Sequence, residues 1–281
     1  MCKLFGYTKQ AFYKARSNSS KKTVAEQEIK EMVLNIRHKL PRTGVRKLHV
    51  MLRESMSRKN MWVGRDKLFG ILRSQHLLVQ RKRKYTRTTD SKHWMRKYPN
   101  LTKDLELTMP EQLWVSDITY LQTVAGNEYL HLVTDAGSKL IMGYEVCGDM
   151  KAVSTKKALE MAISKREYEH QLIHHSDRGL QYCSYDYIRL LSHNNITISM
   201  TENGDPYENA VAERVNGILK DEFGLDAVFK GKAQLYKQVH QAIELYNQMR
   251  LHSSVNMLTP RQAHSKPKIF VKRWKKKEPS K

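Results

Sequence analysis

Three acidic residues stand out in this chain of 281 residues, and the first of them occupies a position that is costly for an acid without a partner. Asp117 interrupts residues 113–121 (Leu-Trp-Val-Ser-Asp-Ile-Thr-Tyr-Leu), the most strand-like run of the sequence. Asp is unfavourable in strands, and an ionised carboxylate among apolar side chains needs a positive charge to compensate it. Asp177 ends a shorter apolar run and is followed by Arg-Gly, which predicts a strand that opens into a loop.

The third acid, Glu213, belongs to a predicted helix over residues 208–220, and 35 residues lie between it and Asp177. Apolar side chains recur on one face of this helix, and polar side chains, including Glu213, recur on the other. Two acids at strand ends and one on a helix can meet on a shared surface and bind hard divalent cations through their oxygens. Two-metal enzymes of phosphoryl transfer use such a site to activate one oxygen and to stabilise the leaving oxygen.

The spacing of these acids, with Lys220 seven residues after Glu213, resembles the DDE catalytic domain of bacterial insertion-sequence transposases and retroviral integrases. The closest similarity is to the insertion-sequence-three family, specifically the product of its second reading frame. Four strings carry the resemblance in family order: Trp114-Val-Ser-Asp-Ile-Thr-Tyr120, His175-Ser-Asp-Arg-Gly-Leu-Gln-Tyr182, Glu208-Asn-Ala-Val-Ala-Glu213 and Tyr246-Asn-Gln-Met-Arg-Leu-His-Ser253. With the amino-terminal part, the resemblance covers nearly the whole chain.

The resemblance implies an α/β fold, a ribonuclease-H-like mixed sheet with Asp117 on its first strand. It implies that Asp117, Asp177 and Glu213 are both the catalytic residues and the ligands of two Mg²⁺ ions, for which Mn²⁺ can substitute. Cleavage at a transposon end would free a 3′-hydroxyl, which would then attack a second phosphodiester. The implied partners are the terminal inverted repeats and target DNA, further copies of this chain on DNA, and an upstream reading-frame product as fusion or partner.

The charge of the chain is unevenly distributed and indicates a polyanionic partner. The net charge is +22, but residues 1–110 carry +19, residues 111–265 carry −4 and residues 266–281 carry +7. Basic segments on both sides of a slightly acidic centre are typical of nucleic-acid binding, since neutralised phosphates release counterions. A basic surface that served only solubility would not predict an acidic middle.

Residues 1–80 are predicted to form a helix-turn-helix-like DNA-binding region. The sequence predicts a turn followed by a short helix within 3–16, with Thr8 as its N-cap, and apolar periodicity predicts helices over 23–40, over 43–56, and from about Gly64 onward. Short helices with tight links and a basic surface suit such a module, and the related transposases carry one before their catalytic domain. From the last helix, three basic residues could contact DNA or could simply be solvated charges: Arg65, Lys67 and Arg73.

Residues 81–108 are predicted to form a basic linker. It begins with four consecutive cations, Arg81, Lys82, Arg83 and Lys84, and shows little apolar periodicity. Aromatic residues alternate with the charges up to Tyr98, which favours a segment that follows the DNA backbone over a merely solvated hinge.

The catalytic domain is predicted over residues 109–265, followed by a basic tail over 266–281. Strands are expected at 113–121, 128–134, 139–147, up to Asp177 and at 196–200, and helices at 153–165, 184–193, 208–220 and 232–250. Three antiparallel strands followed by alternating helices and strands predict a mixed α/β sheet.

Each candidate residue also has a simpler interpretation when it is taken alone. Asp117 could be a solvent-facing strand acid, Asp177 a turn residue and Glu213 a solvated helix residue; only their joint order and spacing favour a triad. Lys220 could hold a phosphate or be an exposed lysine, and Arg250, with His252, could contact DNA or pack within the fold. Other carboxylates compete for a role, with Asp135 first among them: Asp135, Asp149, Asp205 and Glu208.

Composition narrows the class of protein further. No apolar run is long enough to span a membrane. Three widely spaced cysteines predict a reducing compartment. Together with this, the resemblance implies a cytoplasmic, nucleoid-associated protein of a bacterium. The alternatives left open are a non-catalytic DNA-binding regulator of the element, a tyrosine recombinase and a structure-selective nuclease.

Overall fold

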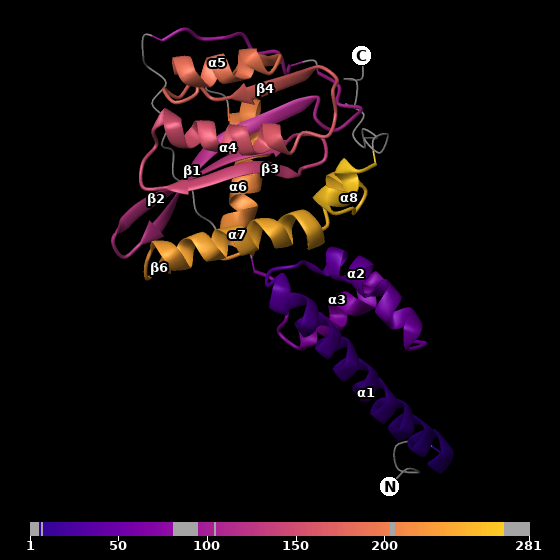
Figure 1. Cartoon of the computed structure of the whole chain (residues 1–281). Helices are drawn as coiled ribbons and strands as arrows, with labels where there is room; N and C mark the ends of the chain where they lie inside the picture. Colours follow the sequence, from indigo (N-terminus) through magenta and orange to yellow (C-terminus); the bar gives the residue numbers. More distant parts are fainter. Residues whose placement is uncertain (1–5, 7, 81–94, 104, 203–205, 267–281) are drawn as a thin grey trace, which may run out of the picture. The chain divides into compact units, whose positions relative to one another are not determined.

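The computed structural model describes residues 6, 8–80, 95–103, 105–202 and 206–266. The chain forms two compact units, Met1–Arg81 and Lys82–Lys281, each with its own hydrophobic core. Figure 1 shows the elements of both units. The cations predicted to follow DNA, Arg81 to Lys84, and the tail beyond Lys266 lie outside the described residues.

The first unit consists of three helices: α1 (Lys9–Lys39), α2 (Val45–Arg58) and α3 (Arg65–Ser74). One apolar core joins them, built from Ile29, Val33, Leu48, Leu52, Met56, Leu68, Ile71 and Leu72. The N-cap prediction is confirmed, since Thr8 Oγ1 accepts a hydrogen bond from the backbone nitrogen of Ala11 at 3.1 Å. The helix-turn-helix-like function of this unit stays a prediction.

The prediction of separate helices over 3–16 and 23–40 was wrong, because α1 is a single helix of 31 residues. The polar run between the two apolar stretches is rich in Ser and Asn, which lower helix propensity by only about half a kcal/mol per residue. Without a Gly or Pro, nothing in that run stops the helix.

The second unit is built on a six-stranded mixed sheet of order β3-β2-β1-β4-β5, with β6 paired to β1. Its strands are β1 (Leu113–Thr123), β2 (Gly126–Asp135), β3 (Ile141–Cys147), β4 (Leu172–Ser176), β5 (Ile196–Met200) and β6 (Val228–Phe229). β2 pairs antiparallel with β1 and β3, whereas β4 pairs parallel with β1 and β5. This topology is the ribonuclease-H-like sheet that the sequence predicted.

Helices cover both faces of this sheet (Figure 1). On one face α4 (Ala152–Ser164) and α5 (Tyr185–His193) share a core with Trp114. On the other, α6 (Ala210–Glu222) and α7 (Lys232–Met249) share a core with Leu121. Short helices lie at Pro206–Asn209 (η2), Ser253–Val255 (η3) and Pro260–His264 (α8).

Two local features differ from the sequence prediction. β3 begins at Ile141 rather than at residue 139, because Lys139 has a φ of 70° and so cannot continue a strand. The catalytic unit also begins before residue 109: Met95 and Tyr98 pack on its core, and Pro99 accepts a backbone hydrogen bond from Met200 of β5 at 3.2 Å. The linker is therefore shorter than predicted.

Gly143 in β3 allows α4 to pack directly on the sheet. A Cβ atom at this position would lie 2.0 Å from the carbonyl oxygen of Ala158 and 2.7 Å from the backbone nitrogen of Ala162. No helix of the described part of the chain is both long and apolar enough to cross a membrane.

Candidate active site

The parallel register of β1 and β4 brings Asp117 and Asp177 to neighbouring positions. Val115 of β1 pairs with His175 of β4. Asp117 comes two residues after Val115, and Asp177 comes two residues after His175, directly beyond the end of β4. Because side chains two residues apart point to the same face of a strand, both carboxylates project from the same face of the sheet. Figure 1 shows β1 beside β4, with α6 crossing the sheet.

Helix α6 carries Glu213 and is attached to β1 by two asparagine side chains. Nδ2 of Asn209 donates to the backbone oxygen of Ser116 at 3.0 Å, and Nδ2 of Asn216 donates to Oδ2 of Asp117 at 2.8 Å. Glu213 lies four residues after Asn209 and three residues before Asn216, so the three side chains lie on one face of the helix. Glu213 itself is exposed.

The electrostatics of Asp117 show that the three acids share one environment. Burial raises the pKa of Asp117 to about 7, and the neighbouring charges of Asp177 and, more weakly, Glu213 act in the same direction. Hydrogen bonds from Asn216 and from the backbone of Ile118 lower this pKa and only partly offset the rise. The pKa of Glu213 is also raised, by desolvation.

The donor set fits a hard divalent cation, because carboxylate oxygens and an excess of negative charge meet at Asp117 of β1, next to the end of β4. Among the described residues, however, no three His, Cys, Asp or Glu side chains are close enough together to hold an ion as they stand. The fold therefore brings the three acids near one another without closing a coordination shell.

Lys220 lies beside this site, as its two-turn spacing from Glu213 predicts. Its Nζ is 4.2 Å from the centroid of the Tyr120 ring, a cation–π distance. Burial lowers the pKa of Lys220, whereas Tyr120, Asp117 and Asp226 act to raise it. The half-buried ammonium is thus close to Asp117 but rests on an aromatic face rather than on the carboxylate.

A buried polar cluster lies on the other side of β1, behind Asp117. Nε2 of His174 is 2.7 Å from Oγ of Ser116 and 2.9 Å from the hydroxyl of Tyr187. Burial lowers the pKa of His174 to about 3, so the ring is neutral and supports the strand. His175 is also buried, with Nδ1 2.8 Å from Oγ of Ser199. Sequence reasoning found the histidines but not these partners, which come from β1, β5 and α5.

Arg250 is used inside the fold. Its guanidinium is paired with the Glu222 carboxylate through contacts of 2.7 and 2.6 Å, and Nη1 lies 2.7 Å from Nε2 of His252. The residue is 4% exposed. This environment favours packing over the predicted DNA contact, and Glu222 is a partner that sequence reasoning missed.

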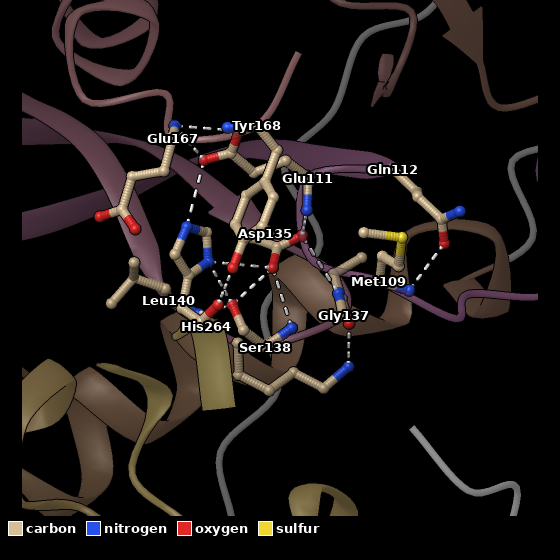
Figure 2. A network of polar contacts seen from close by, with 12 residues as sticks. Met109, Glu111, Gln112, Asp135, Gly137, Ser138, Leu140, Glu167, Tyr168 and His264 are labelled. Atoms are coloured by element: carbon tan, nitrogen blue, oxygen red, sulfur yellow. Dashed lines mark hydrogen bonds and ion pairs between the residues drawn. The ribbon is translucent and has the colours of Figure 1, made fainter. Parts of the chain in front are cut away.

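The remaining candidates belong to other elements of the fold. Arg65, Lys67 and Arg73 are exposed on α3 of the first unit, where Arg65 Nε lies 2.9 Å from Asp66 Oδ1. Asp135, the competing carboxylate, is completely buried and binds Ser138 and His264 (Figure 2). Its role is structural.

Two family profiles match the chain, both described as integrase core domain, over residues 108–206 and 194–260. The 31 kDa protein of insertion element IS600 from Shigella sonnei is 32% identical over 264 residues, 92% of this chain and 96% of its own. Transposase InsF of insertion sequence IS3A from Escherichia coli K12 is 35% identical over 197 residues, 69% of this chain and 68% of its own.

Two viral integrase structures are among the solved structures that match the chain. The integrase catalytic core of HTLV-2 in complex with magnesium matches with a TM-score of 0.46 and 21% identity, over 56% of this chain and 97% of that chain. The intasome of simian T-cell lymphotropic virus in complex with a PP2A regulatory subunit matches with a TM-score of 0.49 and 17% identity, over 85% of this chain and 76% of that chain.

Proposed function

The chain belongs to the IS3 family of insertion-sequence transposases, and from that premise we propose that Asp117, Asp177 and Glu213 are its catalytic carboxylates. The observation that carries the proposal is the β1–β4 register, which sets Asp117 beside Asp177 on the face that α6 covers. The enzyme is a polynucleotidyl transferase that cuts DNA at the ends of the element and joins the freed end to new DNA.

We assign the metal-binding role to the same three acids. They would hold two Mg²⁺ ions, or Mn²⁺ in their place, and the bound ions supply Lewis-acid stabilisation of the phosphodiester and lower the pKa of the attacking water. The raised pKa of Asp117 supports this assignment, because a buried carboxylate beside two others gains most from a bound cation.

The protein residues position the reacting groups. Asn216 holds the Asp117 carboxylate, and α6 carries Glu213 and Lys220 on nearly the same face, two turns apart. Lys220 would bind the phosphate next to the scissile bond without occupying the carboxylates, and the contact of its ammonium with the Tyr120 ring rather than with Asp117 supports this role. One site would serve twice: a water attacks first and frees a 3′-hydroxyl, and that hydroxyl then attacks a second phosphodiester.

DNA binding by the first unit, the linker and the tail completes the proposal. The exposed Arg65, Lys67 and Arg73 of α3 would contact the terminal inverted repeats. The four cations from Arg81 to Lys84 and the basic tail would follow the phosphate backbone of these ends or of target DNA. We expect several copies to assemble on the two ends, alone or with an upstream reading-frame product, in the bacterial cytoplasm.

A strand-cleavage and joining assay with the element's own ends tests this function. The wild-type chain should nick the ends and join them only with Mg²⁺ or Mn²⁺ present, and Glu213→Gln should bind the ends but do neither. Unchanged DNA-dependent activity in Asp117→Ala and Glu213→Gln would instead indicate a regulator. A trapped phosphotyrosyl adduct formed without metal would indicate a tyrosine recombinase, and cleavage without joining would indicate a nuclease.

A further inference from the structure

Two buried asparagines on α6 contact consecutive residues of β1. Asn209, the N-cap of the helix, and Asn216 are seven residues apart and are 7% and 5% exposed. Asn209 donates to the Ser116 backbone, and Asn216 donates to the Asp117 side chain. Two contacts two helical turns apart fix both the height and the rotation of α6, and so the direction in which Glu213 points.

The Asn216 contact does more than attach the helix. A hydrogen bond of 2.8 Å to Oδ2 restricts rotation of the Asp117 carboxylate. The donor is uncharged, so it orients the carboxylate without neutralising it; an Arg or Lys at this distance would pair with Asp117 and compete with a cation.

Both asparagines lower the stability of the fold relative to an apolar side chain at the same position. The Oδ1 atoms of Asn209 and Asn216 are buried, and neither has a hydrogen-bond partner among the residues that the structure describes. A buried, unsatisfied carbonyl is unfavourable, and an apolar side chain of similar size would avoid that penalty. Departures of this kind from the packing rules are expected at functional sites.

We propose that Asn216 is a positioning residue that orients Asp117 for cation binding, whereas Asn209 only docks α6 on the sheet. The proposal rests on the proposed function, since it concerns the same carboxylates. Residues that hydrogen-bond to metal ligands orient them, and their loss lowers metal affinity or activity about 10-fold to 100-fold.

The test compares Asn216→Leu with Asn209→Leu. The two substitutions remove the same carboxamide from similarly buried positions, one at the N-cap of α6 and one inside it, and leucine keeps the number and branching of the heavy atoms while adding the same volume at both. Mg²⁺ is titrated against each variant of the full chain while the melting temperature is followed, and then again while cleavage of a DNA end is followed. Asp117→Asn is the control for the site, because Mg²⁺ bound at Asp117 should no longer raise the melting temperature of this variant. Any rise that remains in Asp117→Asn comes from Mg²⁺ bound elsewhere.

We expect Asn216→Leu to raise the Mg²⁺ midpoint about 10-fold to 100-fold in both titrations, with much of the cleavage rate recovered at saturating Mg²⁺. Asn209→Leu should leave the midpoint within about twofold of the wild type, although both variants melt earlier without metal. Equal shifts in the two variants, or an unshifted midpoint in Asn216→Leu, would overturn the proposal while the proposed function stands. A wild-type chain without any Mg²⁺-dependent stabilisation or cleavage would overturn both.

Discussion

Nε2 of His264 lies 3.1 Å from Oε1 of Glu111, although 153 residues separate the two in the chain (Figure 2). On the other side of the ring, Nδ1 of His264 is 3.5 Å from Oδ2 of Asp135. All three side chains are fully buried. The contact attaches α8 to the start of β1 and the end of β2, and it places an imidazolium between two carboxylates.

This arrangement predicts that the catalytic unit loses stability in mildly alkaline solution. Burial lowers the pKa of His264, but hydrogen bonds and charge from Asp135 and Glu111 outweigh it and raise the pKa to about 9. Since the pKa in the unfolded chain is about 6.5, the stabilisation is complete below that pH and is lost as the pH rises through about 9. Urea unfolding at several pH values should show a loss on the order of 2 kcal/mol across this window.

The matched variants for this prediction are His264→Gln and His193→Gln, the latter an exposed histidine of α5. His264→Gln should be less stable than the wild type near pH 6, and the difference should shrink toward pH 9. Three other titratable groups face the cluster of Glu111, Asp135 and His264, and they are present in the wild type and in His264→Gln alike: Arg166, Tyr168 and Lys139. A stability difference that is independent of pH would show that His264 is neutral in the fold.

A second prediction concerns the pair formed by Arg250 and Glu222. The side chains are 5% and 18% exposed, so removal of Arg250 takes the guanidinium away from a largely buried carboxylate. Arg250→Met should therefore lower the free energy of unfolding by about 3 to 5 kcal/mol, measured by urea denaturation. The double variant Arg250→Met with Glu222→Gln should be more stable than Arg250→Met alone, because it removes the charge of that carboxylate as well.

The same variants distinguish packing from DNA contact. At a temperature where Arg250→Met remains folded, its affinity for DNA and the salt dependence of that affinity should equal those of the wild type. Weaker DNA binding in a variant of unchanged stability would restore the DNA-contact interpretation of Arg250.

The sequence predicted those parts of the fold and site whose signals are local. The apolar run around Asp117, the Arg-Gly after Asp177 and the periodicity around Glu213 each mark an element within about ten residues, and each element is present in the structure. A mixed sheet with Asp117 on its first strand followed from the resemblance and from the antiparallel and alternating patterns of the elements, but the order of its strands was not predicted. Metal ligation itself stays a prediction, because no local pattern sets the distances between the acids.

Interactions between distant segments could not be predicted. Glu222 and Arg250 are 28 residues apart and Glu111 and His264 are 153 apart, so no periodicity relates them. Asn216 was visible only as one polar residue on the outer face of a helix, and its contact with Asp117 depends on how α6 crosses β1. The single helix α1 was missed for the opposite reason, because weak helix formers were interpreted as a break.

A third prediction follows from the crowding of negative charge at Asp117. Asp117→Asn removes a buried charge that Asp177 and Glu213 repel, and it retains an oxygen that can accept from Asn216. Without divalent cations the variant should be more stable than the wild type by on the order of 1 to 2 kcal/mol. For a unit of this size that corresponds to a melting temperature about 2 to 8 °C higher, measured in EDTA. A lower melting temperature would mean that the carboxylate is compensated within the protein.

The fourth prediction separates two uses of the Lys220 ammonium, which lies 4.2 Å from the Tyr120 ring centroid. If Lys220 binds a phosphate, Lys220→Gln should weaken DNA binding and reduce the slope of log affinity against log salt by about 0.9, the value for one phosphate contact. The control is Lys156→Gln on α4, where Nζ lies 3.5 Å from Glu160 on the opposite face of the sheet; its slope should match the wild type. Were Lys220 only to stabilise the fold through Tyr120, Lys220→Gln would lower the melting temperature and leave the salt slope unchanged.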